Sequence, residues 1–438
     1  MKVLLLFSNS NIGGAERSIS RMIFNNRKIK NIYFLGTISG EGPWCTWVKK
    51  NGHNPIILGQ ERNFLKKYFK FITFIKNEKF DVIYVFGLRI SIFVRFIKFF
   101  FSFKLVHGVR WNPKDNNFLN IFFKSTEYLF SNLIDGYITN SIVAKKTLTD
   151  DCNIDNSKVI NIYNGIKEYK KNYINFNPEN IVLILANLTP RKGHIEFLEV
   201  IKIVIKKNID TKFILLGRDE MNGKVQKLIL DNDLSKNVFY LGFKNNVNEW
   251  ILKSSFIALP SLWGEGCPTS ILEAFSLGVP ALAYDIDGNH ELIQNNHNGY
   301  LIEKYNKKDF ANKINYLLEN NTELEKFKKN TKNNLSSKFN LDNCLLQHEF
   351  FFKKTLTSKN NNIDILIIIN SLDLGGTENH IYNVIKNIDK SKIKIALYVL
   401  KSGGILEKNF RDEGIEIFQT NSGIIKSLFK LMKIIKKY

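Results

Sequence analysis

The chain has 438 residues, and 63 Lys and Arg against 41 Asp and Glu give it a formal net charge of +22. That length suggests about three domains, and a composition of 44% hydrophobic and 24% charged residues excludes wholesale disorder. Its four cysteines lie far apart with no CxxC pair, which excludes a disulfide-dense secreted scaffold and a thiolate zinc site and fits a reducing cytoplasm.

No segment is long enough to predict a membrane span. The apolar run at residues 3–7 is too short for a signal peptide. The most apolar stretch, residues 90–106, is interrupted by Arg95, Lys98 and Lys104. We therefore expect a cytoplasmic protein, with peripheral attachment to the inner face of the cytoplasmic membrane left open.

The first part of the chain alternates short apolar runs with helical patterns. Residues 2–7 predict a buried strand, followed by a Gly-rich turn, a helix over residues 15–24 and a strand at residues 31–35. Further strands are expected at residues 55–58, 81–86, 104–107, 136–139 and 159–162. This alternation is typical of βαβ units that form a parallel sheet.

The pattern pauses at Asn164-Gly165-Ile166 and a polar stretch, residues 167–179, which is typical of a linker between domains. A second α/β series follows, with strands expected near residues 181–186, 213–216, 238–241, 256–259, 281–284 and 300–302 and charged helices from residue 308 to about 354. Ligands bind at the carboxyl ends of parallel strands. We therefore expect two such domains to face one another across a ligand-binding cleft.

The end of the chain resembles its beginning. After a polar linker, residues 357–362, a new strand is expected at residues 363–369. With an offset of 375 − 13 = 362, Gly13, Gly14 and Glu16 match Gly375, Gly376 and Glu378. This indicates an internal repeat. Its last residue corresponds to position 438 − 362 = 76, before the strand at residues 81–86, so the repeat is incomplete.

The first candidate for chemistry is the turn Gly13-Gly14-Ala15-Glu16, where a helix N-terminus presents free N–H groups to an anion. It is neither a G-x-G-x-x-G fingerprint nor a P-loop, so the NAD and P-loop interpretations lose support. A purely structural tight turn explains this motif equally well.

Two later turns carry charged side chains. Arg191 and Lys192 precede a helix, and two adjacent cations suit a diphosphate, although a solvated basic loop remains an alternative. Glu265 and Glu273 stand eight positions apart around a Gly-x-Pro-Thr-Ser turn. Either carboxylate alone would be read as a surface charge, but the pair within this Gly and Pro framing favours a functional site.

With these motifs in order, the chain resembles the retaining nucleotide-sugar glycosyltransferases of family four, which have the GT-B fold. The resemblance covers about residues 1–356, and its most specific motif is the pair Glu265 and Glu273. Arg191-Lys192-Gly193, Asn164-Gly165-Ile166, Gly13-Gly14-Ala15-Glu16 and residues 285–291 agree in order and context.

The resemblance implies an α/β fold with two Rossmann-like domains facing across a cleft, plus a partial third Rossmann-like unit at the C-terminus. Residues 1–166 would form the acceptor-side domain, 167–340 the nucleotide-sugar donor domain, and 341–356 a helix that crosses back to the first domain. Residues 357–362 would be a linker and 363–438 an incomplete repeat of the N-terminal domain.

The resemblance also implies roles for individual residues. Glu265 would contact the hydroxyls of the donor sugar, Glu273 the ribose, and Lys192 the diphosphate. His107 matches the family histidine beside the transferred sugar. The polar cradle around the donor would be completed by Gly14 and by the turn Gly266, Cys267, Pro268, Thr269 and Ser270.

In one position the chain departs from the family pattern. The family often has an arginine four or five residues before the lysine, and here that position is Asn187. We expect Arg191 to take over part of its charge.

The expected mechanism is electrostatic: the acceptor attacks from the face that the diphosphate leaves, with retention of configuration and no assigned protein nucleophile. No cofactor and no metal are expected. Asp285 and Asp287 superficially match a metal-binding Asp-x-Asp, but they follow a late strand, and we interpret them as a loop.

The expected partners are a nucleotide-sugar donor and a polysaccharide, lipopolysaccharide or lipid-linked glycan acceptor. An anionic membrane surface is a further candidate, because Arg89, Arg95, Lys98 and Lys104 alternate with phenylalanines. A core-facing helix with snorkelling bases explains that stretch equally well.

Two other classes of protein remain as alternatives, a basic nucleic-acid-binding protein and a non-catalytic structural protein. No zinc finger, RNP-like motif or basic tail supports nucleic-acid binding, so no nucleic-acid partner is expected. The donor sugar, its base and the acceptor are not specified by any motif.

Overall fold

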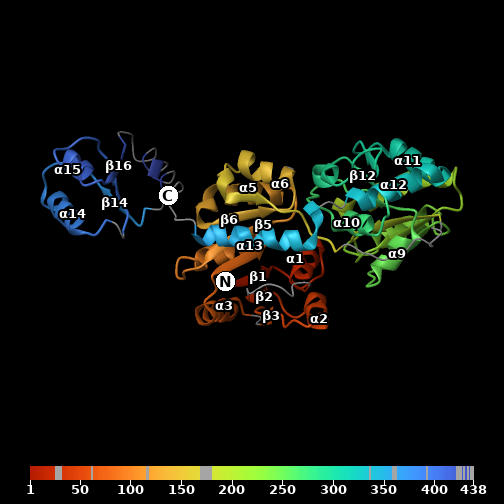
Figure 1. Cartoon of the computed structure of the whole chain (residues 1–438), viewed down its shortest axis with the longest axis horizontal. Helices are drawn as coiled ribbons and strands as arrows, with labels where there is room; N and C mark the ends of the chain where they lie inside the picture. The colour runs from red at the N-terminus through yellow and green to blue at the C-terminus, as the bar shows by residue number, and fades with distance from the viewer. Residues whose placement is uncertain are drawn as a thin grey trace. The chain divides into compact units, whose positions relative to one another are not determined.

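The computed structural model describes residues 1–24, 32–60, 63–114, 118–167, 180–334, 337–357, 363–390 and 393–420, together with 427, 430, 431 and 434. The chain forms two compact units (Figure 1). The first comprises Met1–Tyr128 and Ile134–Leu356, and the second comprises Leu129–Leu133 and Thr357–Tyr438. The expected linker at residues 167–179 lies outside the described residues except for Lys167, as does the linker at 357–362 except for Thr357.

A seven-stranded parallel sheet organises the first domain of the large unit. Its order is β3-β2-β1-β4-β5-β6-β7. The strands are β1 (Lys2–Phe7), β2 (Ile32–Thr37), β3 (Ile56–Ile57), β4 (Val82–Phe86), β5 (Lys104–Val109), β6 (Gly136–Thr139) and β7 (Val159–Asn161). All their pairings are parallel. The interior strand β1 is almost entirely apolar and buried, as expected for a strand covered on both faces.

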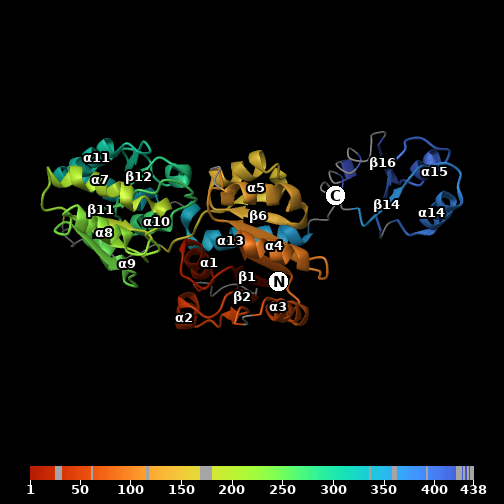
Figure 2. The ribbon, with the colours of Figure 1, turned by 180° about the vertical axis from the view of Figure 1, so that it is seen from behind.

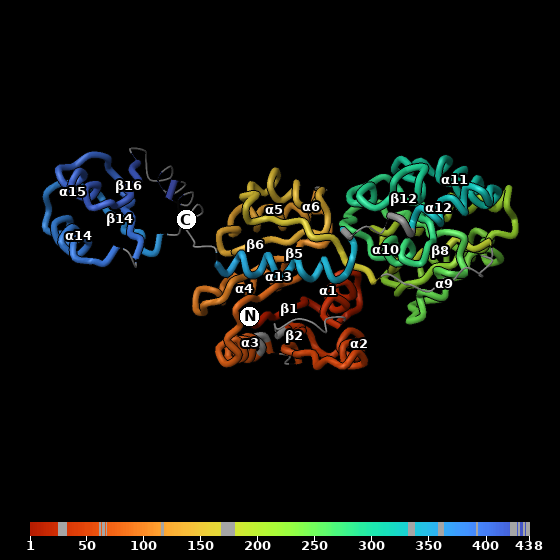
Figure 3. The backbone as a smooth tube through the Cα atoms, viewed as in Figure 1, coloured from red at the N-terminus to blue at the C-terminus, as the bar shows by residue number. Residues whose placement is uncertain are grey.

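Helices cover both faces of this sheet. They are α1 (Gly14–Phe24), α2 (Pro43–Lys50), α3 (Phe64–Glu78), α4 (Leu88–Ile97), α5 (Phe118–Phe130) and α6 (Ile142–Lys146), with α13 (Leu341–Thr357) joining them from much later in the chain. One core contains residues of α1, α2 and α13, and the other contains residues of α3, α4 and α5 (Figure 2). Figure 3 shows α13 running across the face of the first sheet.

A six-stranded parallel sheet organises the second domain of the large unit, in the order β10-β9-β8-β11-β12-β13. The strands are β8 (Ile181–Leu185), β9 (Lys212–Leu216), β10 (Val238–Gly242), β11 (Phe256–Leu259), β12 (Ala281–Tyr284) and β13 (Gly299–Ile302). The helices are α7 (His194–Ile205), α8 (Lys224–Asp231), α9 (Val247–Lys253), α10 (Thr269–Ser276), α11 (Lys307–Glu319) and α12 (Asn321–Asn334). The expected α/β class is confirmed, and every strand expected up to residue 302 is present with its ends within two residues of prediction.

The small unit contains a three-stranded parallel sheet in the order β14-β15-β16. Its elements are β14 (Ile365–Ile369), α14 (Gly376–Asn387), β15 (Ile395–Val399), α15 (Glu407–Asp412) and β16 (Glu416–Gln419). These have the same order and direction as β1, α1, β2, α2 and β3. That residues 363–438 are a second copy of the N-terminal domain stays a prediction.

Among the described residues, none of the helices combines the length and the apolarity needed to cross a membrane.

Candidate active site

A cavity of about 680 Å³ lies between the two domains of the large unit. The first domain lines it with the turn before α1 and with residues that follow β5 and β7. The second domain lines it with the carboxyl ends of β8 and β9 and with the turn before α10. The cavity therefore lies at the edge where ligands bind in open parallel sheets.

The segment after β8 brings Arg191 and Lys192 to this cavity. A short 3-10 helix, Pro190–Lys192, ends at Gly193, whose φ of 67° is in the left-handed region. A Cβ at Gly193 would lie 2.1 Å from the carbonyl oxygen of Pro260, so only glycine fits. This tight turn holds both cations beside the segment that follows β11.

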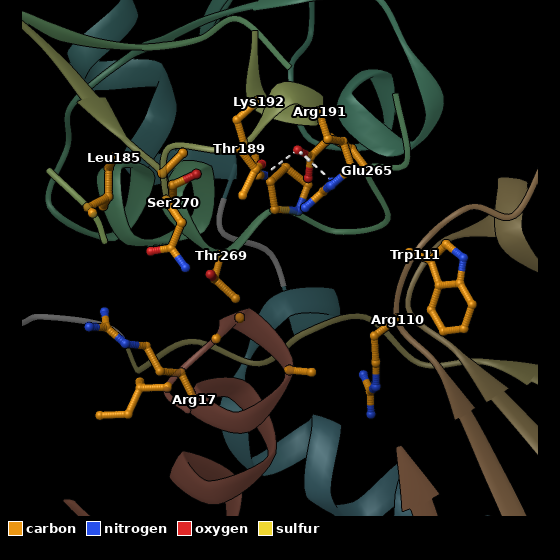
Figure 4. A pocket seen from close by; sticks show the side chains of 18 of the residues that line it. Arg17, Arg110, Trp111, Leu185, Thr189, Arg191, Lys192, Glu265, Thr269 and Ser270 are labelled. Carbon is orange, nitrogen blue, oxygen red and sulfur yellow. Dashed lines mark hydrogen bonds and ion pairs between the residues drawn. The ribbon is translucent and has the colours of Figure 1, made fainter. Parts of the chain in front are cut away.

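Glu265 is the centre of a buried charge cluster. Its side chain is 6% exposed, its Oε1 accepts a hydrogen bond from Lys192 Nζ, and Arg191 Nη1 lies 3.4 Å from the same oxygen (Figure 4). Burial by itself raises the pKa of Glu265, but Lys192 and Arg191 outweigh it and bring the pKa down to about 2. Glu265 is therefore an ionised carboxylate held in a fixed orientation by two cations.

The turn from Gly266 to Ser270 lies close to the first domain. A Cβ at Gly266 would lie 2.2 Å from Asn140 Oδ1, and one at Gly14 would lie 3.5 Å from Thr269 Oγ1. All five turn residues, Gly266, Cys267, Pro268, Thr269 and Ser270, line the cavity together with Gly14. Pro268 has no backbone N–H group, so only the other four residues of the turn can donate a backbone hydrogen bond to a ligand.

Glu273 lies on α10 with 5% of its side chain exposed, and two arginines of α1 reach it from the other domain. Arg21 Nη1 lies 2.6 Å and Arg17 Nη1 3.8 Å from Glu273 Oε1. The Arg17 guanidinium also lies over the ring of Phe243, with its Cζ 5.5 Å from the centroid. The sequence reasoning missed both arginines, although their i,i+4 spacing after the Gly13-Gly14 turn was a usable signal.

His107 was expected beside the transferred sugar, and the structure does not place it there. It does not line the cavity, and it is fully buried on the side of the sheet that α4 and α5 cover. Its Nδ1 lies 3.2 Å from a Glu127 carboxylate oxygen and 3.3 Å from Ser91 Oγ. Burial lowers the pKa of His107, against the opposing effect of Glu127. Because β5 continues to Val109, His107 is inside the strand rather than at its end.

The residues that follow β5 into the cavity are Arg110 and Trp111 (Figure 4). Arg110 Nη1 donates to Asn164 Oδ1 at 3.2 Å. Asn164, in the Asn-Gly motif after β7, also donates through Nδ2 to the carbonyl of Cys267 at 2.6 Å. Arg110 and Asn164 thus connect the end of the first sheet to the turn before α10. Sequence reasoning attached no role to Arg110.

Asn187 occupies the position where the family often has arginine. Its Nδ2 donates to Glu220 Oε1 at 3.0 Å, and its Oδ1 accepts from the N–H of Arg218 at 3.0 Å. Asn187 lines the cavity and links the ends of β8 and β9 without adding charge.

Asp285 and Asp287 have separate surroundings. Asp287 accepts hydrogen bonds from Asn112 Nδ2 at 2.5 Å and from the N–H of Glu265 at 3.1 Å. Asp285 is half-exposed, 3.6 Å from His290 Nδ1. Within the part of the chain that the structure describes, no group of three or more His, Cys, Asp or Glu side chains is arranged to hold a metal ion.

Comparisons with known proteins agree with this architecture. The family model described as "Glycosyltransferase Family 4" matches residues 39–168, and the one described as "Glycosyl transferases group 1" matches residues 165–334. The chain therefore belongs to the family-four glycosyltransferases with the GT-B fold.

Two curated relatives of the chain are glycosyltransferases whose names give different substrates. The chain is 29% identical over 231 residues to a poly(ribitol-phosphate) alpha-N-acetylglucosaminyltransferase of Staphylococcus aureus (strain COL), covering 51% of this chain and 45% of that protein. It is 25% identical over 296 residues to an Escherichia coli UDP-Gal:alpha-D-GlcNAc-diphosphoundecaprenol alpha-1,3-galactosyltransferase, covering 63% of this chain and 76% of that protein. The match thus spans less than half of the first relative.

Solved structures share the fold. Anabaena Alr3699/HepE in complex with UDP-glucose superimposes with a TM-score of 0.70 at 21% identity, covering 82% of this chain and all of that one. The structure of TarM gives a TM-score of 0.66 at 16% identity and covers 80% of this chain and 98% of that one.

Proposed function

We propose that residues 1–356 transfer a hexose-type sugar from a nucleoside-diphosphate sugar to a polysaccharide, lipopolysaccharide or lipid-linked glycan, with retention of anomeric configuration. The observation that carries this proposal is the arrangement of Lys192, Arg191 and Glu265 beside the Gly266–Ser270 turn in one cavity. One fold neighbour was solved with UDP-glucose, and two relatives act on poly(ribitol phosphate) and on a diphosphoundecaprenol-linked sugar.

In this mechanism the protein supplies electrostatic stabilisation rather than a nucleophile. Cleavage of the sugar–phosphate bond leaves negative charge on the diphosphate. Lys192, Arg191 and the turn line the cavity, where their positive charges and N–H groups would stabilise that charge. The acceptor hydroxyl attacks from the face of departure and passes its proton to the leaving phosphate. Glu265 remains ionised near neutral pH and orients the donor sugar.

The stereochemical part of the proposal has a direct test. Proton NMR of the first product formed from an α-linked nucleotide sugar should show an α-linkage. A β-linked first product would contradict retention.

We also propose that transfer needs no resident metal. Activity measured after dialysis against EDTA should stay within two-fold of the untreated enzyme. A loss that added Mg²⁺ or Mn²⁺ restores would contradict this.

We further propose that the first domain contacts an anionic lipid surface. The contact is made chiefly by residues other than the cations of the stretch at residues 89–104. Arg95 is buried and pairs with Glu127, while Lys98 and Lys104 lie by Asp135. Instead, large apolar side chains are exposed on α4, on the segment after it, and on α5: Phe96, Phe99, Phe100, Phe118, Leu119 and Phe122. This aromatic patch lies on neighbouring helices, since Arg95 of α4 bonds Thr126 and Glu127 of α5.

Vesicle co-sedimentation tests the aromatic patch. The double variant Phe99→Ser/Phe100→Ser should lose most of its binding to vesicles of phosphatidylglycerol and phosphatidylcholine, because these rings are 67% and 73% exposed. Ile209→Ser, which removes a 74% exposed side chain from the second domain, is the matched control. Equal binding by the double variant and the wild type would contradict the lipid contact.

A further inference from the structure

We propose that Arg110 binds a phosphate group of the substrates on the first-domain side of the cavity. This inference rests on the proposed function, because the phosphate belongs either to the diphosphate of the donor or to a phosphate-bearing acceptor.

Arg110 follows the last residue of β5 and lines the cavity with Trp111. Figure 4 shows it across the cavity from the cluster of Lys192, Arg191 and Glu265. A ligand that spans the cavity between the two domains therefore has a cation on each side.

The partners of the Arg110 guanidinium are neutral. Nη1 donates to Asn164 Oδ1 at 3.2 Å, and Nη2 donates to the Tyr84 hydroxyl at 2.7 Å. Nη2 also lies 3.2 Å from His348 Nε2. The other ring nitrogen of His348, Nδ1, lies 2.7 Å from the carbonyl oxygen of Cys344, so Nδ1 carries the proton and Nε2 accepts. Burial and the Arg110 charge lower the pKa of His348 to about 3, which keeps this ring neutral.

The other arginines and lysines around the site differ in this respect. Arg17 and Arg21 lie beside Glu273, and Arg191 and Lys192 lie beside Glu265. Arg110, in contrast, forms an ion pair with no carboxylate of the residues that the structure describes. Its Nε is buried and has no hydrogen-bond partner within the described part of the chain.

Arg110 is half-buried, and a partly desolvated cation without a counter-ion favours the binding of an anion. Three neutral partners fix the guanidinium without neutralising it, so its charge is available to the ligand. Both N–H groups of Nη2 are used by Tyr84 and His348, so Nη1 keeps one N–H for a ligand. The full positive charge favours a phosphate oxygen over an uncharged sugar hydroxyl. We therefore infer a phosphate rather than a sugar as the group that Arg110 contacts.

Binding measurements on the full chain test this inference without requiring sugar transfer. Affinities for UDP, uridine and inorganic pyrophosphate are compared by calorimetry for the wild type, Arg110→Gln and Arg110→Lys. The control is Arg411→Gln, which removes the same charge from an exposed position in the small unit. Parallel kinetics give KM for the donor and for a phosphate-bearing acceptor.

A donor phosphate on Arg110 predicts a 10- to 100-fold loss of UDP and pyrophosphate affinity in Arg110→Gln, with uridine affinity unchanged. An acceptor phosphate predicts unchanged UDP affinity and a 10- to 100-fold rise in KM for the acceptor alone. Arg110→Lys keeps the positive charge, so in either case it should lose less affinity or raise KM less than Arg110→Gln does. It serves as the test if Arg110→Gln does not fold.

Values within two-fold of the wild type in all assays would overturn the inference, as would an equal loss for uridine and UDP. If the wild type binds pyrophosphate through Arg110 but transfers no sugar, the proposed function fails while the inference stands.

Discussion

At the scale of single residues, the site depends on charges that are buried and fixed in orientation. Glu265 has a pKa near 2 because Lys192 and Arg191 more than offset the effect of burial. Its Oε1 is shared by both cations, so removal of the charge loosens the whole cluster.

Glu265→Gln keeps the shape of the side chain and removes its charge. We expect kcat to fall by about 10²- to 10³-fold, the range found when one preorganised electrostatic group is removed from an active site. Circular dichroism and the melting temperature should show a folded protein. Wild-type kcat in a folded Glu265→Gln enzyme would remove Glu265 from the mechanism.

His194 gives a pH-dependent prediction. It is 3% exposed at the start of α7, and neither ring nitrogen has a hydrogen-bond partner among the residues that the structure covers. Burial next to Lys192 lowers its pKa to about 4. The unfolded chain binds a proton near pH 6.5 and the folded chain only near pH 4. Stability is therefore lost as pH falls through this window, by on the order of 1 kcal/mol per pH unit.

His194→Phe should flatten this dependence, which urea unfolding at pH 7.5, 6 and 5 measures directly. An unchanged slope in the variant would show that His194 is not the group responsible. Phe is similar in size and lacks the unpaired nitrogens, so it should not weaken the fold at pH 7.5.

At the scale of elements, most of the fold could be predicted from sequence, and the site only in part. The strands are apolar runs punctuated by turns, and that pattern is local, so their ends fell within two residues of expectation. The turns with Lys192 and Glu265 were also found from local pattern. His107 was expected at the end of its strand, but β5 runs two residues further, to Val109, so the first residue after the strand is Arg110.

Arg110 could not have been found from local pattern at all. One of its partners, His348, is 238 positions away on α13, and only the folded chain brings them together. Arg21 and Glu273 likewise meet only because α1 and α10 face each other across the domains.

The turn before α10 provides a prediction at this scale. Gly266→Ala should abolish most transfer, because its Cβ would lie 2.2 Å from Asn140 Oδ1 in the other domain. The double variant Gly266→Ala/Asn140→Ala should recover part of the activity. Gly376→Ala, where a Cβ meets nothing within 4 Å, is the control. Full activity of Gly266→Ala alone would contradict this close approach.

At the scale of the whole molecule, the described lining of the cavity belongs to the large unit. Among the residues that the structure describes, those that line the cavity all lie between Ile12 and Glu273. The four cores of its two sheets, including the contribution of α13, use residues up to Phe352. The small unit has its own core.

Deletion of residues 358–438 should therefore leave kcat within two-fold of the full chain. Size-exclusion chromatography and thermal unfolding establish whether the shortened chain is folded. A folded but inactive truncation would show that the small unit contributes to the working enzyme.

The central claim is that the cavity binds a nucleotide sugar and that Lys192 holds its diphosphate. The most direct test is nucleotide release from a panel of UDP-, GDP- and dTDP-sugars with a glycan or lipid-linked acceptor, comparing the wild type with Lys192→Met. We predict acceptor-dependent release with at least one donor and a loss of at least 100-fold in the variant. No release from any donor, or equal release by a folded Lys192→Met enzyme, would contradict the claim.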